Sequence, residues 1–319
     1  MRIVSLLPSA TEIVYALGLG DKLAGVTSSC DYPAGAAGKT VVSRAVIEDD
    51  GLTAAQLDQL VSRYAADGLS VYGLDAEAIG RIDPDVILTQ DLCRVCAVPS
   101  GQVDEALARL GCRAEVVSLD PTSLDDVLDG IERVGRATGT DARAIEVVAR
   151  LRSRINRVRT ATRGRTPVAT ACLEWLDPPF TGGHWVPEMV EVAGGTSLLS
   201  GRGERSRRAT WEEVVASRPE VLVAMPCGYG LDQATAEARA LLDDDALRGV
   251  RVVAADADGL FSRPGPRLVD GLEALAWVLH PDAVPAPAPG AVAELVRTTP
   301  RGRPTRSGGP CAAPATPRR

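Results

Sequence analysis

A long helical stretch without glycine or proline divides this chain into two halves. It runs from Asp141 to Arg163, and the first glycine after it is Gly164. An apolar stripe recurs at steps of three and four residues, at Ile145, Val148, Leu151, Ile155 and Val158. That spacing predicts one amphipathic helix. At 1.5 Å per residue the helix would span roughly 35 Å, long enough to run between two lobes as a stiff connection.

Strands followed by helices are predicted on both sides of this helix. Short apolar runs predict buried strands at Ile3–Leu7, Leu23–Thr27, Val86–Thr89, Ala114–Ser118, Pro167–Leu173, Val221–Ala224 and Val250–Ala254. Capping-box spacing predicts helix starts at Ser9 and Thr210, each with a glutamate three residues on, and Thr53 caps a further helix. This order is typical of parallel sheets flanked by helices.

The two halves resemble each other. The stretch 83–88 parallels 218–223, and 112–117 parallels the strand near 250 at a nearly equal offset, which indicates two lobes of one design. The first strands lie further apart, which indicates an insertion in the first half at residues 40–70. The predicted organisation is an N-terminal α/β lobe at 1–138, a connecting helix at 139–164, a C-terminal α/β lobe at 165–283 and a tail at 284–319.

The tail differs from the rest of the chain in composition. Residues 284–319 contain eight prolines and no aromatic residue, so they bury too little surface to offset their ordering entropy, and we predict that they are disordered. The tail also carries six arginines and one glutamate, whereas the whole chain has a formal net charge of −7. An acidic body argues against nucleic-acid binding, which requires a basic face.

The N-terminal residues predict a cytoplasmic protein. One charge precedes a short apolar run that ends at Pro8, without the longer run and cleavage site of a secretory signal. Seven scattered cysteines fit a reducing compartment. No apolar run reaches eighteen residues, so no membrane span is predicted. We expect a monomer in the cytoplasm; a start chosen too far downstream would instead place it in the periplasm or on the cell surface.

Candidate ligand-binding residues follow the predicted strands, because ligands of parallel α/β domains bind beyond the carboxyl ends of the strands. These candidates are Pro8, Ser9, Thr11, Cys30, Asp31, Tyr32, Asp91, Trp175, Phe180, His184, Trp185, Glu188, Cys227, Tyr229, Phe261 and Arg263. Six of them are aromatic, and rings in loops suit a cleft for a large, flat, partly apolar ligand. Alternatively, several of the rings pack the lobes' own loops. The helix start at Ser9 offers N–H groups for a phosphate or carboxylate, with plain capping as the alternative.

A metal site is a second hypothesis. Cys93 and Cys96 form a C-x-x-C pair, and with His184 they could hold a soft metal such as zinc. The alternatives are a redox pair or plain loop cysteines. The phosphate-binding and nucleophile-elbow motifs G-x-x-x-x-G-K-[ST] and G-x-S-x-G are missing from the sequence, so no catalytic residues are predicted.

The opening stretch 2–12 resembles that of the iron-siderophore and cobalamin periplasmic binding proteins, and 83–88 and 218–223 are similar to paired strands of that family. The resemblance extends over about residues 2–283. It implies the family's fold, the class III periplasmic-binding-protein type, in which two Rossmann-like parallel-sheet lobes are joined by one long rigid helix. The stretches most similar to a cobalamin-binding branch are 90–96, 174–179, 183–189 and 262–267. Ser28 and Ser29 depart from that branch, which often has His-Glu there.

The resemblance implies a non-enzymatic protein that binds cobalamin, a related corrinoid or a metal chelate in the cleft between the lobes. Two alternatives stay open. One is the substrate-binding component of an ABC importer, with a permease as partner if the protein is exported. The other is a thiol and histidine metal-binding protein or enzyme that uses Cys93, Cys96 and His184.

Overall fold

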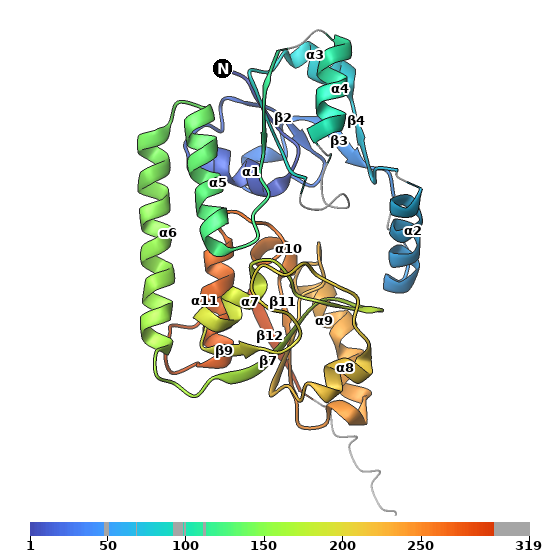
Figure 1. Cartoon of the computed structure of the whole chain (residues 1–319), viewed down its shortest axis with the longest axis vertical. Helices are drawn as coiled ribbons and strands as arrows, with labels where there is room; N and C mark the ends of the chain where they lie inside the picture. The colour runs from blue at the N-terminus through green and yellow to red at the C-terminus, as the bar shows by residue number, and fades with distance from the viewer. Residues whose placement is uncertain (48–50, 68, 92–97, 99, 111–112, 297–319) are drawn as a thin grey trace, which may run out of the picture.

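The computed structural model has two lobes, each built on a six-stranded sheet, with a long helix along one side of both (Figure 1). It describes residues 1–47, 51–67, 69–91, 98, 100–110 and 113–296. The two-lobed α/β architecture predicted from the sequence is therefore confirmed. Within the described part of the chain, no helix combines the length and the apolar character that crossing a bilayer requires.

The N-terminal sheet has the strand order β4-β3-β2-β1-β5-β6, and all its pairings are parallel except that of β3 with β4. Its strands are β1 (Ile3–Ser5), β2 (Leu23–Thr27), β3 (Thr40–Ala45), β4 (Tyr72–Leu74), β5 (Val86–Thr89) and β6 (Glu115–Ser118). Its helices are α1 (Pro8–Ala16), η1 (Ala34–Ala36), α2 (Ala54–Ala66), α3 (Ala76–Ile82), α4 (Ser100–Leu110) and α5 (Leu124–Ala137). The central strands β1 and β5 are buried along their whole length, as Val- and Ile-rich strands of a parallel sheet usually are.

The C-terminal sheet has the order β12-β11-β10-β7-β8, with β9 paired to β7. Its strands are β7 (Val168–Leu176), β8 (Pro179–Thr181), β9 (Gly195–Ser197), β10 (Val221–Ala224), β11 (Arg251–Ala255) and β12 (Val292–Leu295). Its helices are α7 (Val186–Val192), α8 (Trp211–Ala216), α9 (Leu231–Ala238), η2 (Arg239–Asp243), η3 (Asp245–Leu247), α10 (Ala257–Leu260) and α11 (Leu268–Leu279). Strands β7, β10 and β11 are parallel, whereas β8 and β12 add antiparallel edges.

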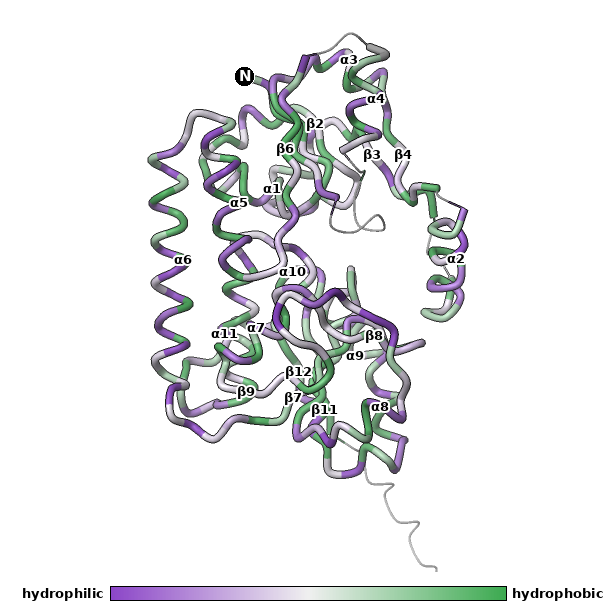
Figure 2. The backbone as a smooth tube through the Cα atoms, viewed as in Figure 1, coloured by the Kyte–Doolittle hydropathy of each residue, from purple (hydrophilic) through white to green (hydrophobic). Residues whose placement is uncertain are grey.

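Helix α6 (Asp141–Thr162) is the predicted connection between the lobes. It packs against α5 of the N-terminal lobe and against α11 and α7 of the C-terminal lobe. Hydrophilic and hydrophobic residues alternate along it, as expected for a helix with one buried face (Figure 2). Val148, Leu151, Ile155 and Val158 are buried as predicted, but Ile145 is 62% exposed, because Ala144 and Val147 occupy the buried face at that turn.

One apolar core extends through both lobes. It contains β1 and α1 residues such as Ile3 and Ile13, continues through α5 and α6, and reaches Met189 and Leu272 in α7 and α11. Two smaller cores cover the other faces of the sheets, one around Ile87 in the N-terminal lobe and one around Leu222 in the C-terminal lobe. The lobes are therefore packed together along the α6 side.

Two predictions about chain segments are wrong. Ser9 does not cap α1, because the helix already begins at Pro8, a residue that favours the first helical position, and Leu7 is the cap residue. Part of the tail predicted to be disordered is a strand: β12 pairs antiparallel with β11, and Val252 lies opposite Leu295. An open sheet edge gave these residues a partner that their proline-rich composition does not reveal. Residues 297–319 lie outside the described part of the chain.

Candidate functional site

The predicted site residues lie near the carboxyl ends of strands in both sheets, in loops, in the helices that follow them or in the strands themselves. In the N-terminal lobe they follow β1, β2 and β5, and in the C-terminal lobe they lie in or after β7 and β8 and after β10 and α10. Several of these loops meet directly across the two lobes. Their contacts separate the residues that hold the lobes together from those whose side chains stay available for a ligand.

Arg263 and Arg267 of the C-terminal lobe bind carboxylates of the N-terminal lobe. The Arg263 guanidinium donates to Asp31 Oδ1 at 2.5 Å and lies 3.6 Å from Glu12 Oε1. Arg263 also donates to both carboxylate oxygens of Asp258 in its own lobe. Arg267 donates to both oxygens of Glu12, at 3.0 and 2.6 Å. We call these five residues the inter-lobe ion cluster.

Burial and charge compete within this cluster. Burial raises the pKa of the Glu12 carboxyl, although Arg267 and Arg263 act to lower it. Burial also acts to raise the pKa of Asp31, but its hydrogen bond with Arg263 and the charge of that residue outweigh burial and hold the pKa below its ordinary value. The pKa of Arg263 is raised, because the carboxylates of Asp31 and Asp258 outweigh the opposing effect of burial. Arg263 therefore stays charged, and with 6% of its side chain exposed it joins the lobes rather than presenting a free cation.

The tyrosine that follows Asp31 lies against the same cluster. The Arg267 guanidinium carbon is 4.0 Å from the centroid of the Tyr32 ring, within the range of a cation–π contact. Tyr32 is nevertheless 47% exposed, so much of its side chain stays available. Of the predicted aromatic residues, it is the one that the N-terminal lobe contributes.

The start of α1 is covered rather than open. Ser9 is buried, and a Cβ atom at Gly265 would lie 3.3 Å from the Ser9 carbonyl oxygen, so the two lobes approach closely there. Thr11 Oγ1 lies 3.1 Å from Cys30 Sγ, and both side chains are buried. Pro8 is half-buried beside them. The first turn of α1 therefore serves as a packing surface, and the predicted open anion site is not formed there.

Two rings of the C-terminal lobe form an edge-to-face pair. The centroids of Trp175 and Tyr229 are 5.4 Å apart, and the Trp175 indole N–H donates to the Asp177 carbonyl at 3.1 Å. Tyr229 is buried, Trp175 is half-buried, and Cys227 beside them is exposed. Because Tyr229 fixes its orientation, the Trp175 ring is a pre-organised apolar surface at the ends of β7 and β10.

Phe180 forms a second partly exposed ring surface, in β8. The Arg208 guanidinium carbon lies 5.5 Å from its ring centroid, and the backbones of the two residues form an isolated antiparallel bridge. Phe180 pairs with Trp175 across the β7–β8 ladder, so the two half-buried rings belong to neighbouring positions of one hairpin.

Trp185 and Phe261 are core residues rather than surface rings. They are 6% and 2% exposed and belong to the large core, and the Trp185 indole N–H donates to the Phe261 carbonyl at 2.9 Å. Their positions after strands suggested a ligand contact, but a loop can fold back onto its own lobe. For these two rings the alternative interpretation, packing within the lobe, matches the structure.

His184 stacks on Trp185 with a centroid distance of 5.7 Å, and its backbone has a φ of 55°. Burial and the nearby positive charge of Arg205 lower the pKa of its imidazole. A neutral imidazole could bind a metal, but Cys93 and Cys96 lie outside the described residues. Among the residues that are described, no group of three His, Cys, Asp or Glu side chains is placed to hold a metal ion.

The two predicted carboxylates Glu188 and Asp91 both accept hydrogen bonds from the protein. Glu188 Oε2 accepts from the Leu124 N–H at 2.8 Å, so a residue of α7 satisfies the first turn of α5 in the other lobe. Asp91 accepts from the Ser100 N–H at 2.9 Å and from the Ser118 hydroxyl at 3.0 Å. Glu188 is mostly covered, whereas Asp91 is exposed.

The predicted ligand-binding residues do not include several charged residues at the contacts between the lobes. Glu12, Arg267 and Asp258 complete the inter-lobe ion cluster, and Asp58 of α2 binds Arg208 at 2.7 Å. Glu12 was interpreted as part of a capping box. The clearest available signal was that a carboxylate one helical turn inside α1 is surrounded by apolar residues and therefore needs a cationic partner.

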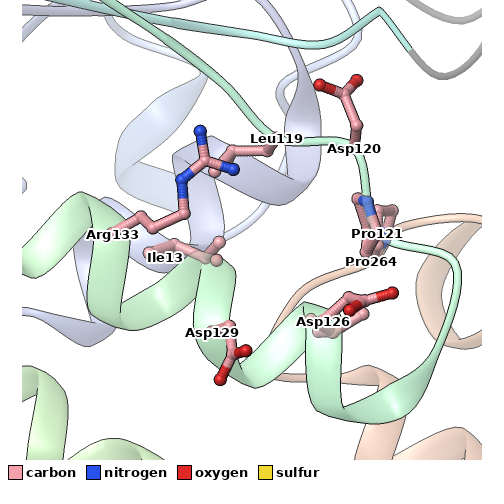
Figure 3. Close-up of a pocket in the computed structure, with 10 residues that line it drawn as sticks. Ile13, Leu119, Asp120, Pro121, Asp126, Asp129, Arg133 and Pro264 are labelled. Carbon is pink, nitrogen blue, oxygen red and sulfur yellow. The ribbon is translucent and has the colours of Figure 1, made fainter.

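A small pocket lies where the lobes meet near α5. Figure 3 shows Asp126, Asp129 and Arg133 of α5 around it, with Pro264 contributed by the C-terminal lobe. Its volume is about 210 Å³, below the range of roughly 300–1,000 Å³ that small-molecule sites usually have. None of the predicted ligand-binding residues lines it. We therefore do not assign the ligand to this pocket.

Comparison with known proteins gives one family and relatives along most of the chain. The family described as periplasmic binding protein matches residues 3–256. The vitamin B12-binding protein of Vibrio cholerae serotype O1 is 26% identical over 285 residues, which cover 87% of this chain and 88% of that protein. An uncharacterized ABC transporter substrate-binding lipoprotein of Bacillus subtilis, YvrC, is 27% identical over 88% of this chain and 80% of its own length.

The crystal structure of the periplasmic vitamin B12 binding protein BtuF of Vibrio cholerae superposes with a TM-score of 0.64 and 25% identity. The match covers 87% of this chain and 96% of that one. The family resemblance found in the sequence is thereby confirmed. The predicted cytoplasmic location is wrong, because these relatives are periplasmic proteins or lipoproteins. That prediction relied on the first residues and on the scattered cysteines, and neither of them fixes the compartment.

Proposed function

Because the chain belongs to the periplasmic binding protein family, we propose that it captures cobalamin, a related corrinoid or another metal chelate between its lobes. It does this without catalysing a reaction, outside the cytoplasm, as the substrate-binding component of an ABC importer. The observation that carries the proposal is the similarity to vitamin B12-binding proteins, which extends over 87% of the chain and includes both lobes.

The chemistry of the facing loops supports a large and partly apolar ligand. Trp175 and Phe180 present half-buried rings from the β7–β8 hairpin, and the Trp175 ring is held in place by Tyr229. We propose these two rings as the ligand-contacting surface of the C-terminal lobe. Tyr32, Asp91 and Cys227, all exposed, are the proposed contacts from the remaining loops. Trp185 and Phe261 are left out because they are buried in the core.

Titration of the purified protein tests this proposal. Cyanocobalamin, aquocobalamin and hemin are added in turn, and binding is followed by the absorbance of the ligand and by calorimetry. We expect saturable one-to-one binding of at least one of them, with a Kd that increases when Trp175 is replaced by alanine. Trp211→Ala, which removes a partly buried ring on the α8 side of the same lobe, is the matched control. Absence of any spectral change or heat with all three compounds rules out the ligand class.

The location and the importer partnership have a separate test. Host cells whose outer layers have been removed, with the cytoplasmic membrane intact, are treated with an external protease, and the loss of this protein is compared with that of a cytoplasmic marker. An extracytoplasmic substrate-binding protein is digested or released while the marker stays intact. Protection of both proteins to the same extent contradicts the proposed location, whatever the ligand titration gives.

A further inference from the structure

Helix α2 lies apart from the packed body of both lobes. It stands on the side of the molecule opposite α6, at the height where the lobes face each other (Figure 1). Its apolar residues Leu57, Leu60, Val61 and Tyr64 are only half-buried, and none of them belongs to the three cores of the described residues. The position of α2 therefore depends less on apolar packing than that of the other long helices.

One ion pair joins α2 to the C-terminal lobe. Asp58 Oδ2 accepts from the Arg208 guanidinium at 2.7 Å, and 13% of the Asp58 side chain is exposed. The same guanidinium lies over the Phe180 ring, one of the two proposed ligand-contacting rings. The contact thus connects the inserted segment of the N-terminal lobe to the rim of the proposed site.

The lobes are held together at two opposite sides of the facing loops. On the α6 side they share a continuous core, the inter-lobe ion cluster and the bond from Leu124 to Glu188. On the other side, the ion pair of Asp58 and Arg208 joins the lobes in the part of the chain that the structure describes. The first connection is buried and extensive, whereas the second is a single ion pair with a half-exposed arginine.

We propose that α2 is a latch, closed by the pair of Asp58 and Arg208, that must open for the ligand to enter or leave the space between the lobes. The inference rests on the proposed function for the identity of the ligand, but the movement of α2 is a property of the ligand-free protein. The cost of opening is limited, because this is one ion pair, its arginine is half-exposed, and salt screens a pair that solvent reaches from one side. Thr53 and Gln56 form a capping box at the start of α2, but a free helix of 13 residues is only marginally stable, so its amides exchange faster when the pair is broken.

Hydrogen exchange of the ligand-free protein tests the latch first. Asp58→Lys places two cations together, and lysine is a better helix former than aspartate, so intrinsic helix propensity opposes any loosening. We expect the amides of α2 to exchange about two- to fivefold faster than in the wild type. The double variant Asp58→Lys, Arg208→Glu restores the pair with reversed charges, and we expect wild-type exchange. Asp245→Asn, which removes an ion pair within the C-terminal lobe, is the control. Unchanged exchange in Asp58→Lys overturns the proposal.

Stopped-flow kinetics with cyanocobalamin tests the consequence for exchange of ligand. A latch changes the barrier and not the bound contacts, so Asp58→Asn is expected to raise the association and dissociation rates by the same factor, about two- to fivefold. The Kd then stays within about twofold of the wild type. An increased Kd with an unchanged association rate shows that Asp58 contacts the ligand and overturns the latch. Failure of cyanocobalamin to bind the wild type counts against the proposed function, whereas the hydrogen-exchange result still decides the latch.

Discussion

The two lobes share a strand-and-helix design but present opposite chemistry to each other. In every direct ion pair between the lobes that the described residues form, the N-terminal lobe supplies the carboxylate, from Glu12, Asp31 or Asp58, and the C-terminal lobe supplies the arginine. The C-terminal lobe also supplies the half-buried rings Trp175 and Phe180. The two lobes therefore contribute opposite charges to the contacts between them, whereas the apolar surface proposed for the ligand belongs mainly to the C-terminal lobe.

The largest effect is expected from removing an arginine at the centre of the inter-lobe ion cluster. Arg263→Met leaves Asp258 and Asp31 without their cationic partner and removes one of the two cations beside the buried Glu12, and breaking a buried pair typically costs about 3–5 kcal/mol. Urea unfolding should show a loss of free energy of unfolding near the lower end of that range, because Arg267 still binds Glu12. Arg248→Met, at an exposed pair, should change the stability little. Equal losses of free energy of unfolding in both variants would show that the inter-lobe ion cluster does not stabilise the fold more than an exposed ion pair does.

The asymmetry in aromatic surface predicts different effects of ring removal on the two lobes. Trp175→Ala should weaken cyanocobalamin or hemin binding by about 10- to 30-fold, the range of a buried aromatic contact that carries much of the binding energy. Tyr32→Ala should have a smaller effect, because that ring is already engaged by Arg267. Calorimetric Kd values for both variants measure the difference. A larger effect at Tyr32 would reverse the assignment of the main ligand surface.

The next effect, of about 1 kcal/mol in the free energy of unfolding, is expected from removing a helix cap. Thr53 in the N-terminal lobe and Thr210 in the C-terminal lobe both form capping boxes, whereas the Ser9 side chain makes no cap bond. Thr210→Ala should therefore lower the free energy of unfolding by about 1 kcal/mol. Ser9→Ala should lower the free energy of unfolding by clearly less, because it removes no helix cap. Thermal and urea unfolding of the two variants measure it, and equal costs would contradict the cap assignment.

The smallest expected effect is a change in the free energy of unfolding at acidic pH. Because the folded-state pKa of Asp31 is lowered, its charge stabilises the protein above the unfolded pKa of about 3.9, and this contribution is lost as pH falls through the folded-state value. The stability difference between wild type and Asp31→Asn should be below about 1 kcal/mol at pH 7, since Asp31 is largely exposed, and should disappear near pH 2. Urea unfolding at several pH values measures this, and a difference that grows in acid would contradict it.

Most of the fold could be predicted because its strands are buried and its helix ends carry local signals. Val86–Thr89 and Val221–Ala224 are apolar runs whose bounds the structure matches. The two capping boxes at Thr53 and Thr210 depend on contacts three residues apart. Strand β12 was missed because its partner β11 lies about forty residues earlier, and short edge strands have no local pattern of their own.

The site was predictable only to the level of loops. Strand ends indicate which loops converge, but they do not indicate where each side chain points. Trp175 and Trp185 both lie near the carboxyl ends of strands, yet the Trp185 indole turns inward, and the Phe261 carbonyl accepts its N–H. The pairing of Glu12 with Arg267 joins residues 255 positions apart, a relation that no spacing within one sequence reveals.

The continuous core along α6 limits how far the lobes of this protein can move when a ligand binds. A protein whose two lobes have separate cores joined by a hinge can undergo domain closure, and its lobes can unfold in two separate transitions. Here α5, α6, α7 and α11 bury their side chains in one shared core. Rotation of one lobe against the other would therefore expose apolar residues of that core to water. We expect a single cooperative endotherm on heating. Discrimination between ligands is then left to the loops, and the rate of ligand entry to the peripheral helix α2, while the packed frame keeps its shape.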